Sequence, residues 1–117
     1  MMKSIPVWKQ ELSDGVHAAR LASLYCCAPA ETASEAARYA AVLDGLEKTF
    51  GSHAEAGLYS APGRTEIGGN HTDHQHGRVL AGSVNIDMIA AAAPNDKNQL
   101  RVQSEGYDLC VIDLNDL

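Results

Sequence analysis

The sequence has few aromatic and few basic residues. Four tyrosines, one tryptophan and one phenylalanine are its aromatic side chains among 117 residues, so we expect a core built from Ala, Leu, Val and Ile. Nine basic residues stand against 15 acidic ones, which gives a net charge of −6 at pH 7. Nucleic acids and anionic membranes both attract basic surfaces. The composition therefore predicts no nucleic-acid partner and no membrane partner.

Cysteines and long apolar runs are also scarce. Cys26, Cys27 and Cys110 are odd in number and form no Cys-x-x-Cys motif, which favours free thiols in a reducing compartment. No apolar run approaches the roughly 20 residues that span a bilayer. The N-terminus also lacks the apolar stretch of a signal peptide. These absences predict a cytoplasmic protein.

The hydrophobic pattern of the first half predicts two helices. One is expected over residues 13–25. The other is expected over residues 32–50, because its apolar side chains recur at steps of three and four. Thr32 and Glu35 have the form of a capping box at its start, and Gly51 can adopt the left-handed geometry that closes a helix.

The second half has the pattern of strands separated by turns. Strands are expected at residues 57–61, 78–88, 100–104 and 109–114, with 89–93 either extending the second strand or forming its neighbour. A loop rich in glycine and histidine is expected from Arg64 to Gly77. Together the elements predict one α+β domain, in which a helical lead-in over 1–51 precedes a loop and a mostly antiparallel sheet over 52–117.

The segment 61–77 holds most of the side chains suited to chemistry. Imidazole and carboxylate groups suitable for zinc occur at His71, Asp73, His74 and His76, which leaves a metal-dependent hydrolase as one interpretation. The pair Gly68-Gly69 is not followed by the Gly-Lys-Ser/Thr of a P-loop. Such a pair indicates a tight turn or a close backbone approach.

The run from Pro62 to Asp73 resembles the signature of the galactokinases. From Gly63 to His74 the chain reads Gly-Arg-Thr-Glu-Ile-Gly-Gly-Asn-His-Thr-Asp-His, and the family pattern at the same positions reads Gly-Arg-x-Asn-Leu-Ile-Gly-Glu-His-Thr-Asp-Tyr. The identical positions are Gly63, Arg64, Gly69, His71, Thr72 and Asp73. The similarity covers most of the chain and is strongest from Ser60 to Asp87.

This resemblance implies the N-terminal part of a GHMP kinase, whose domain resembles ribosomal protein S5 domain 2. The full-length enzyme would use ATP and Mg²⁺ to phosphorylate the anomeric hydroxyl of galactose or a related hexose. The family's Gly- and Ser-rich phosphate loop does not occur in these 117 residues. The resemblance therefore implies that the remainder of the kinase is required and that the chain alone is inactive.

The resemblance also assigns roles to five residues. Arg64 is expected to be catalytic, because a guanidinium can stabilise charge on a transferring phosphoryl group. The sugar hydroxyls are expected to bind Glu66, Asn70, His71 and Asp73, whose polar atoms can donate or accept hydrogen bonds. Asn70 replaces the family's glutamate and Glu66 replaces its asparagine, so the identity of the hexose stays open.

Structural alternatives remain for these assignments. Arg64 can be an ion-pair partner, His71 can hold a turn through the backbone, and Asp73 can cap that turn. If His71 and Asp73 bind sugar, no metal is expected at the histidines. For the chain as a whole, the alternative to a kinase portion is a non-catalytic carbohydrate-binding or regulatory module.

Overall fold

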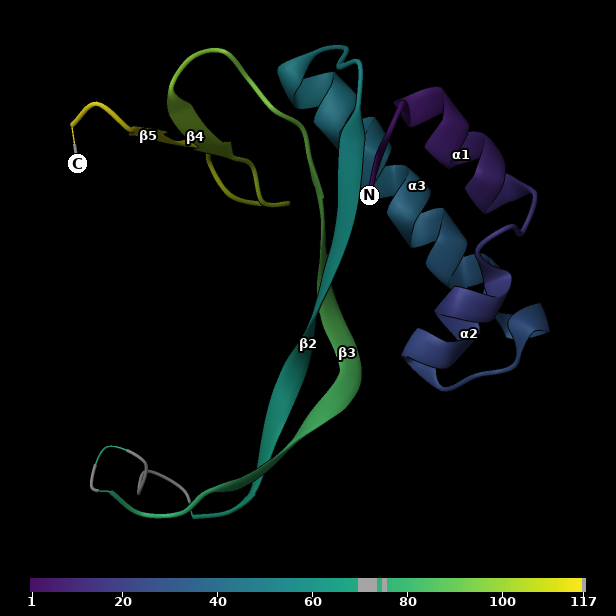
Figure 1. Ribbon diagram of the computed structural model, residues 1–117, viewed down its shortest axis with the longest axis vertical. Helices are drawn as coiled ribbons and strands as arrows, with labels where there is room; N and C mark the ends of the chain where they lie inside the picture. The colour runs from purple at the N-terminus through teal and green to yellow at the C-terminus, as the bar shows by residue number, and fades with distance from the viewer. Residues whose placement is uncertain (70–73, 75, 117) are drawn as a thin grey trace.

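The computed structural model describes residues 1–69, 74 and 76–116. Its elements in chain order are β1 (Met2–Lys3), α1 (Ile5–Ser13), α2 (Ala18–Tyr25), the 3₁₀ turn η1 (Pro29–Glu31), α3 (Ala33–Phe50), β2 (Ala56–Gly68), β3 (Leu80–Ala92), β4 (Gln99–Val102) and β5 (Cys110–Asp113). Figure 1 shows the helices on one side of a long β2–β3 hairpin. The expected α+β class is confirmed.

The strands form two antiparallel sheets. One has the order β1-β2-β3, and the other pairs β4 with β5. The four expected strands are thus present, with β1 added at the edge of β2. Residues 89–93 extend the strand before them, since β3 continues unbroken to Ala92.

The expected start of the first helix is wrong. Residues 13–25 do not form one helix: α1 ends at Ser13 and α2 begins at Ala18. The Asp14 N–H donates to the Gln10 carbonyl oxygen at 2.8 Å, and Gly15 has φ +71°. The turn therefore closes a helix whose existence the sequence analysis missed.

The bounds expected for α3 are confirmed, but its capping box is not. Thr32 Oγ1 donates to the Pro29 carbonyl oxygen at 2.8 Å and makes no cap hydrogen bond to α3. Glu35 does not reach back, because it accepts a hydrogen bond from Arg38 at 2.5 Å. Gly51 ends the helix with φ +85° and ψ −175°, so the expected left-handed helical conformation is wrong, although the positive φ still favours glycine there.

The core lies between the helices and one half of the β2–β3 hairpin, residues 56–62 of β2 and 87–92 of β3, which is called the near half. Its buried hydrophobic residues are Ile5, Trp8, Leu12, Leu21, Ala22, Tyr25, Tyr39, Leu43, Leu46 and Ala56. The expectation of a purely aliphatic core is therefore wrong, since three of the six aromatic side chains are buried in it. Trp8 Nε1 donates to the Ala56 carbonyl oxygen at 2.8 Å, which joins α1 to β2.

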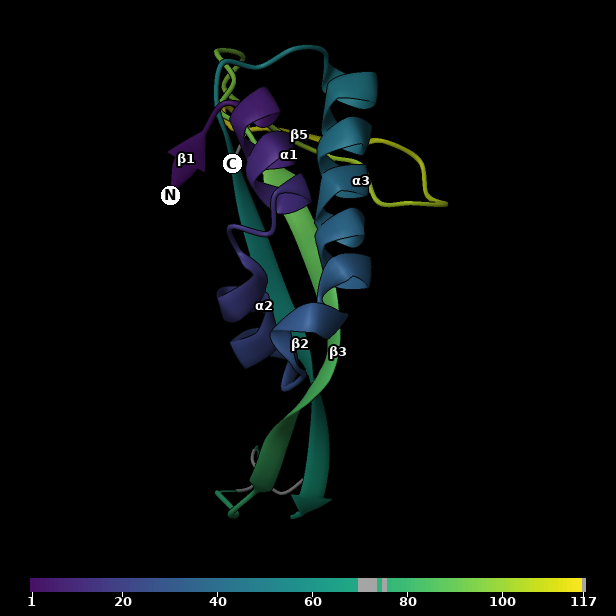
Figure 2. The same cartoon turned by 90° about the vertical axis from the view of Figure 1, so that its right-hand side faces the viewer.

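The rest of the hairpin, residues 63–68 of β2 and 80–86 of β3, is called the far half. It extends beyond the helices, as Figures 1 and 2 show. The Cα radius of gyration is 17.5 Å, against about 13 Å for a compact chain of this size. The loop expected from Arg64 begins only after Gly68, because Arg64, Thr65 and Glu66 pair with β3. None of the helices that the structure describes combines the length and apolarity needed to cross a membrane.

Candidate functional site

Arg64 and Glu66 lie two residues apart on β2, so their side chains project from the same face. Arg64 Nη2 contacts Glu66 Oε1 at 2.9 Å, and the two side chains are 70% and 26% exposed. The ion pair considered as an alternative for Arg64 is therefore formed. An exposed pair contributes only about 0–1 kcal/mol. The guanidinium stays accessible to an anionic ligand.

Arg64 follows an irregularity in the pairing of β2 with β3. Pro62 pairs with Asp87, whereas Arg64 pairs with Ser83. One residue of β2 therefore stands opposite residues 84–86 of β3. Such a bulge bends a hairpin and increases its local twist. Arg64 is the first regularly paired residue beyond this bend.

Gly63 is the β2 residue at the bulge, and its lack of a side chain lets the strands approach there. A Cβ atom at Gly63 would lie 3.0 Å from Val84 Cγ2 and 3.1 Å from the Ile86 carbonyl oxygen. Both distances are shorter than ordinary van der Waals contact. The signature glycine before Arg64 thus has a steric role in the fold.

Gly69 confirms the close backbone approach expected from the glycine pair. It has φ +83°, and a Cβ atom here would overlap the carbonyl oxygen of Arg78. At Gly68 the space around such an atom is open. Gly69 therefore permits the two ends of the segment 69–79 to lie close together.

Asn70, His71 and Asp73 lie outside the described residues, so their expected sugar contacts stay predictions. The metal interpretation also depends on two of them. Within residues 1–69, 74 and 76–116, no group of three or more His, Cys, Asp or Glu side chains could hold a metal ion. Cys26, Cys27 and Cys110 are free thiols, as expected.

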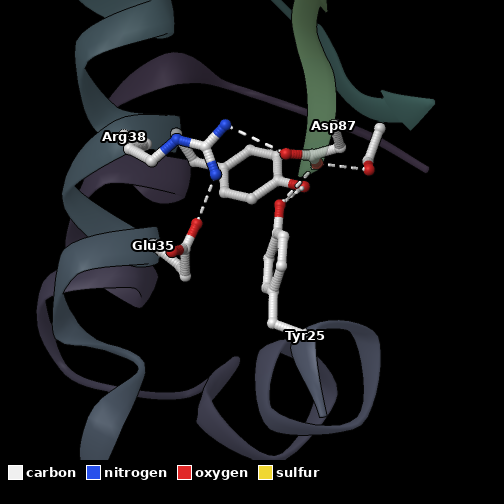
Figure 3. Close-up of polar contacts among 6 residues, drawn as sticks. Tyr25, Glu35, Arg38 and Asp87 are labelled. Carbon is white, nitrogen blue, oxygen red and sulfur yellow. Dashed lines mark hydrogen bonds and ion pairs between the residues drawn. The ribbon is translucent and has the colours of Figure 1, made fainter. Parts of the chain in front are cut away.

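A carboxylate that the sequence analysis did not select lies beside the bulge. The Asp87 side chain is only 3% exposed. Tyr25 Oη and Ser60 Oγ each donate to its Oδ2 at 2.6 Å, and Arg38 Nη2 donates to its Oδ1 at 2.9 Å. Figure 3 shows Asp87 facing Arg38 and Tyr25, with Glu35 on the other side of Arg38. The donors come from α2, β2 and α3.

The electrostatics of this cluster keep Asp87 ionised. Burial acts to raise the pKa of Asp87, but its three hydrogen-bond donors lower the pKa by more. Burial, aided by the hydrogen bonds to Asp87 and Tyr39, raises the pKa of Tyr25. Hydrogen bonds to Asp87 and Glu35 raise the pKa of Arg38. The cluster is thus a carboxylate held by a neutral phenol and a charged guanidinium.

The sequence contains a signal for this cluster. Asp87 is the one charged residue in the thirteen residues of β3. A charge within an apolar strand needs a partner, because burying it alone is costly. Arg38, which lies off the apolar stripe of α3, is such a partner. The sequence alone does not single out Arg38 as this partner, because several other basic residues precede β3.

Comparison with known proteins agrees with the motif. Residues 46–94 match the galactokinase galactose-binding signature. The chain is 36% identical over 71 residues to a galactokinase of Ligilactobacillus salivarius, which covers 60% of this chain and 18% of that protein. It is 33% identical over 66 residues to a galactokinase of Lacticaseibacillus casei, covering 56% and 17%. No solved structure matches the chain.

The matched segment thus carries the galactose-binding signature of a class of sugar kinases. The resemblance to the galactokinases expected from the sequence is confirmed. The chain spans 17–18% of the length of these curated relatives.

Proposed function

We propose that this chain is the galactose-binding, N-terminal portion of a galactokinase-like sugar kinase. The match of residues 46–94 to the galactose-binding signature carries this proposal. The full-length enzyme would transfer the γ-phosphoryl group of ATP to the anomeric hydroxyl of galactose or a related hexose. In this proposal, residues 1–51 and 52–117 are the helical and strand parts of one GHMP kinase domain of the S5 domain 2 type.

Arg64 is the proposed catalytic residue. Its exposed guanidinium supports this role, because five N–H donors can hold phosphoryl oxygens as charge develops. Its ion pair with Glu66 orients the fork without burying it. Glu66 can accept hydrogen bonds from sugar hydroxyls on the same face of β2. Asn70, His71 and Asp73 are proposed to complete the sugar site.

The proposed activity requires ATP and Mg²⁺. Of the groups that the structure describes, the Arg64 guanidinium can meet the transferring phosphoryl group, but this one cation beside one carboxylate cannot hold a whole nucleotide with its metal. The sequence also lacks a Gly- and Ser-rich phosphate loop. We therefore propose that the nucleotide site lies in the remainder of the kinase. A cytoplasmic location, expected from the sequence, stays part of the same proposal.

A sugar titration tests this function. We expect the 117-residue chain to bind D-galactose in isothermal titration calorimetry and to bind it less tightly after Asp73→Ala. Arg20→Ala, on the distant helix α2, is a control and should leave binding unchanged. Failure of the wild-type chain to bind galactose, together with one equivalent of bound zinc, would instead support the hydrolase.

A further inference from the structure

Asp87 marks the point where the hairpin changes its relation to the helices. In the near half of β3, the less exposed residues are Asp87, Ile89 and Ala91, at odd positions. In the far half they are Gly82 and Val84, at even positions. Because side chains alternate along a strand, this change of parity means that the bulge re-aims the far half. Figure 2 shows β2 and β3 twisting about each other where the hairpin extends below the helices.

None of the described helices α1, α2 and α3 packs against the far half, so its direction is set where it leaves the core. Pro62 and Asp87 form the last regular pair before the bulge. Arg64 then lies two residues along β2, and Glu66 lies two residues further. A rotation at the level of Asp87 would therefore move both side chains relative to the core.

The contacts of Asp87 are suited to fixing an orientation. Three donors from α2, α3 and β2 meet one carboxylate, and each hydrogen bond constrains a direction as well as a distance. Apolar packing would stabilise this junction without such directionality. Buried ion pairs contribute little net stability over apolar residues of similar volume. The cluster accordingly constrains geometry more than it strengthens the core.

We propose that Asp87 is a positioning residue for Arg64 and Glu66. By holding β3 to α2, α3 and β2, it sets the direction in which the far half of the hairpin presents these two side chains. This inference rests on the proposed function and deepens it, because it places a determinant of sugar affinity at a residue that does not contact the sugar.

The test combines galactose affinity with the orientation of the hairpin in the 117-residue chain. Asp87→Asn keeps the shape of the side chain but removes its charge and one acceptor. We expect its Kd for D-galactose to rise about tenfold or more, because the binding side chains would no longer be held in the orientation that the sugar requires. Residual dipolar couplings should show the N–H vectors of residues 64–68 reoriented relative to α3.

Glu35→Gln is the matched control, because it removes the other carboxylate partner of Arg38 and leaves Asp87 in place. It should change the Kd less than about twofold, because Glu35 contacts Arg38 within α3 and does not hold β3. Ser60→Ala removes a single donor and should give an intermediate effect. It also keeps the test open if Asp87→Asn fails to fold, as judged by helical circular dichroism.

The outcomes separate this proposal from the proposed function. A wild-type chain that does not bind galactose contradicts the sugar site, while the dipolar couplings still decide whether Asp87 orients the hairpin. Unchanged orientation in Asp87→Asn and Ser60→Ala overturns the positioning role. So does a changed orientation that leaves galactose affinity at the wild-type value.

Discussion

The two halves of the β2–β3 hairpin differ in what they contact. The near half, up to Pro62 and back from Asp87, lies against three helices and contributes Ala56 to the core. The far half holds Arg64 and Glu66 and exposes apolar side chains such as Ile67, which is 68% exposed. One continuous pair of strands thus joins a packed region to a candidate binding region.

This difference separates stability from recognition within one supersecondary unit. Burial of apolar surface stabilises the near half, whereas side chains in the far half remain free to meet a ligand. Substitutions in the two halves should therefore have different consequences. The predictions below use this contrast, and the largest expected effect comes first.

Leu43→Ala should destabilise the chain by about 2–5 kcal/mol, because its fully buried side chain would leave a cavity in the core. Ile67→Ala, an equally apolar change in the far half, should cost less than about 0.5 kcal/mol. Urea denaturation followed by Trp8 fluorescence measures both. Similar losses for the two variants would mean that the far half also belongs to the cooperative core.

Asp73→Ala should lower kcat/KM for galactose in the full-length enzyme by roughly tenfold for each charge-assisted hydrogen bond lost, at about 1.5–3 kcal/mol per bond. The KM for ATP should be spared. Arg64→Ala should instead lower kcat most, because its charge matters as the phosphoryl group transfers. Steady-state kinetics with each substrate varied distinguish the two. Unchanged galactose kinetics in folded Asp73→Ala would instead favour the alternative in which Asp73 caps a turn.

Asp87→Asn should destabilise the chain at pH 7 by about 1–3 kcal/mol, because buried donors lose a charged acceptor. The pKa of Asp87 is lowered in the folded state. Its stabilising contribution is therefore present above the unfolded pKa of about 3.9 and disappears as pH falls through the folded pKa. Urea denaturation at several pH values should show the difference between wild type and variant shrinking below about pH 4. A constant difference would contradict the linkage.

Gly69→Ala should cost about 1–2 kcal/mol, because a positive φ is unfavourable for alanine and its Cβ would meet the Arg78 backbone. Gly68→Ala is the matched control, since nothing lies near a Cβ at that position. Thermal unfolding compares the pair. Equal melting temperatures for both variants would show that the close approach at Gly69 is dispensable.

Local pattern predicts the parts of this fold that local interactions determine. The bounds of α3 follow from an apolar stripe through Tyr39, Leu43 and Leu46, which is buried as expected. Helix α1 was missed because its packing depends on distant partners: Trp8 bonds to Ala56, which is 48 residues away. Long-range pairing decides such elements, and periodicity in a short segment does not report it.

The same distinction applies to the candidate site. The motif identified Arg64 and Glu66, but their common face follows only from the extension of β2 to Gly68. Glycine and charged residues in 64–68 favour a loop in isolation, and pairing with β3 overrides that preference. Asp87 was not selected, because its role depends on donors from three elements that only the folded chain brings together.

The bulge at residues 84–86 also affects how the protein can change in evolution. In a regular hairpin, inserting a residue shifts every later side chain to the opposite face and disrupts the core. Here the extra residues lie on the far side of Asp87, so a change in their number leaves the near pairing from Gly57 to Pro62 intact. Short insertions or deletions at this bulge can therefore redirect the far half without any compensating core substitution. Under the proposed function, this adjustable geometry would suit sugars of different shape.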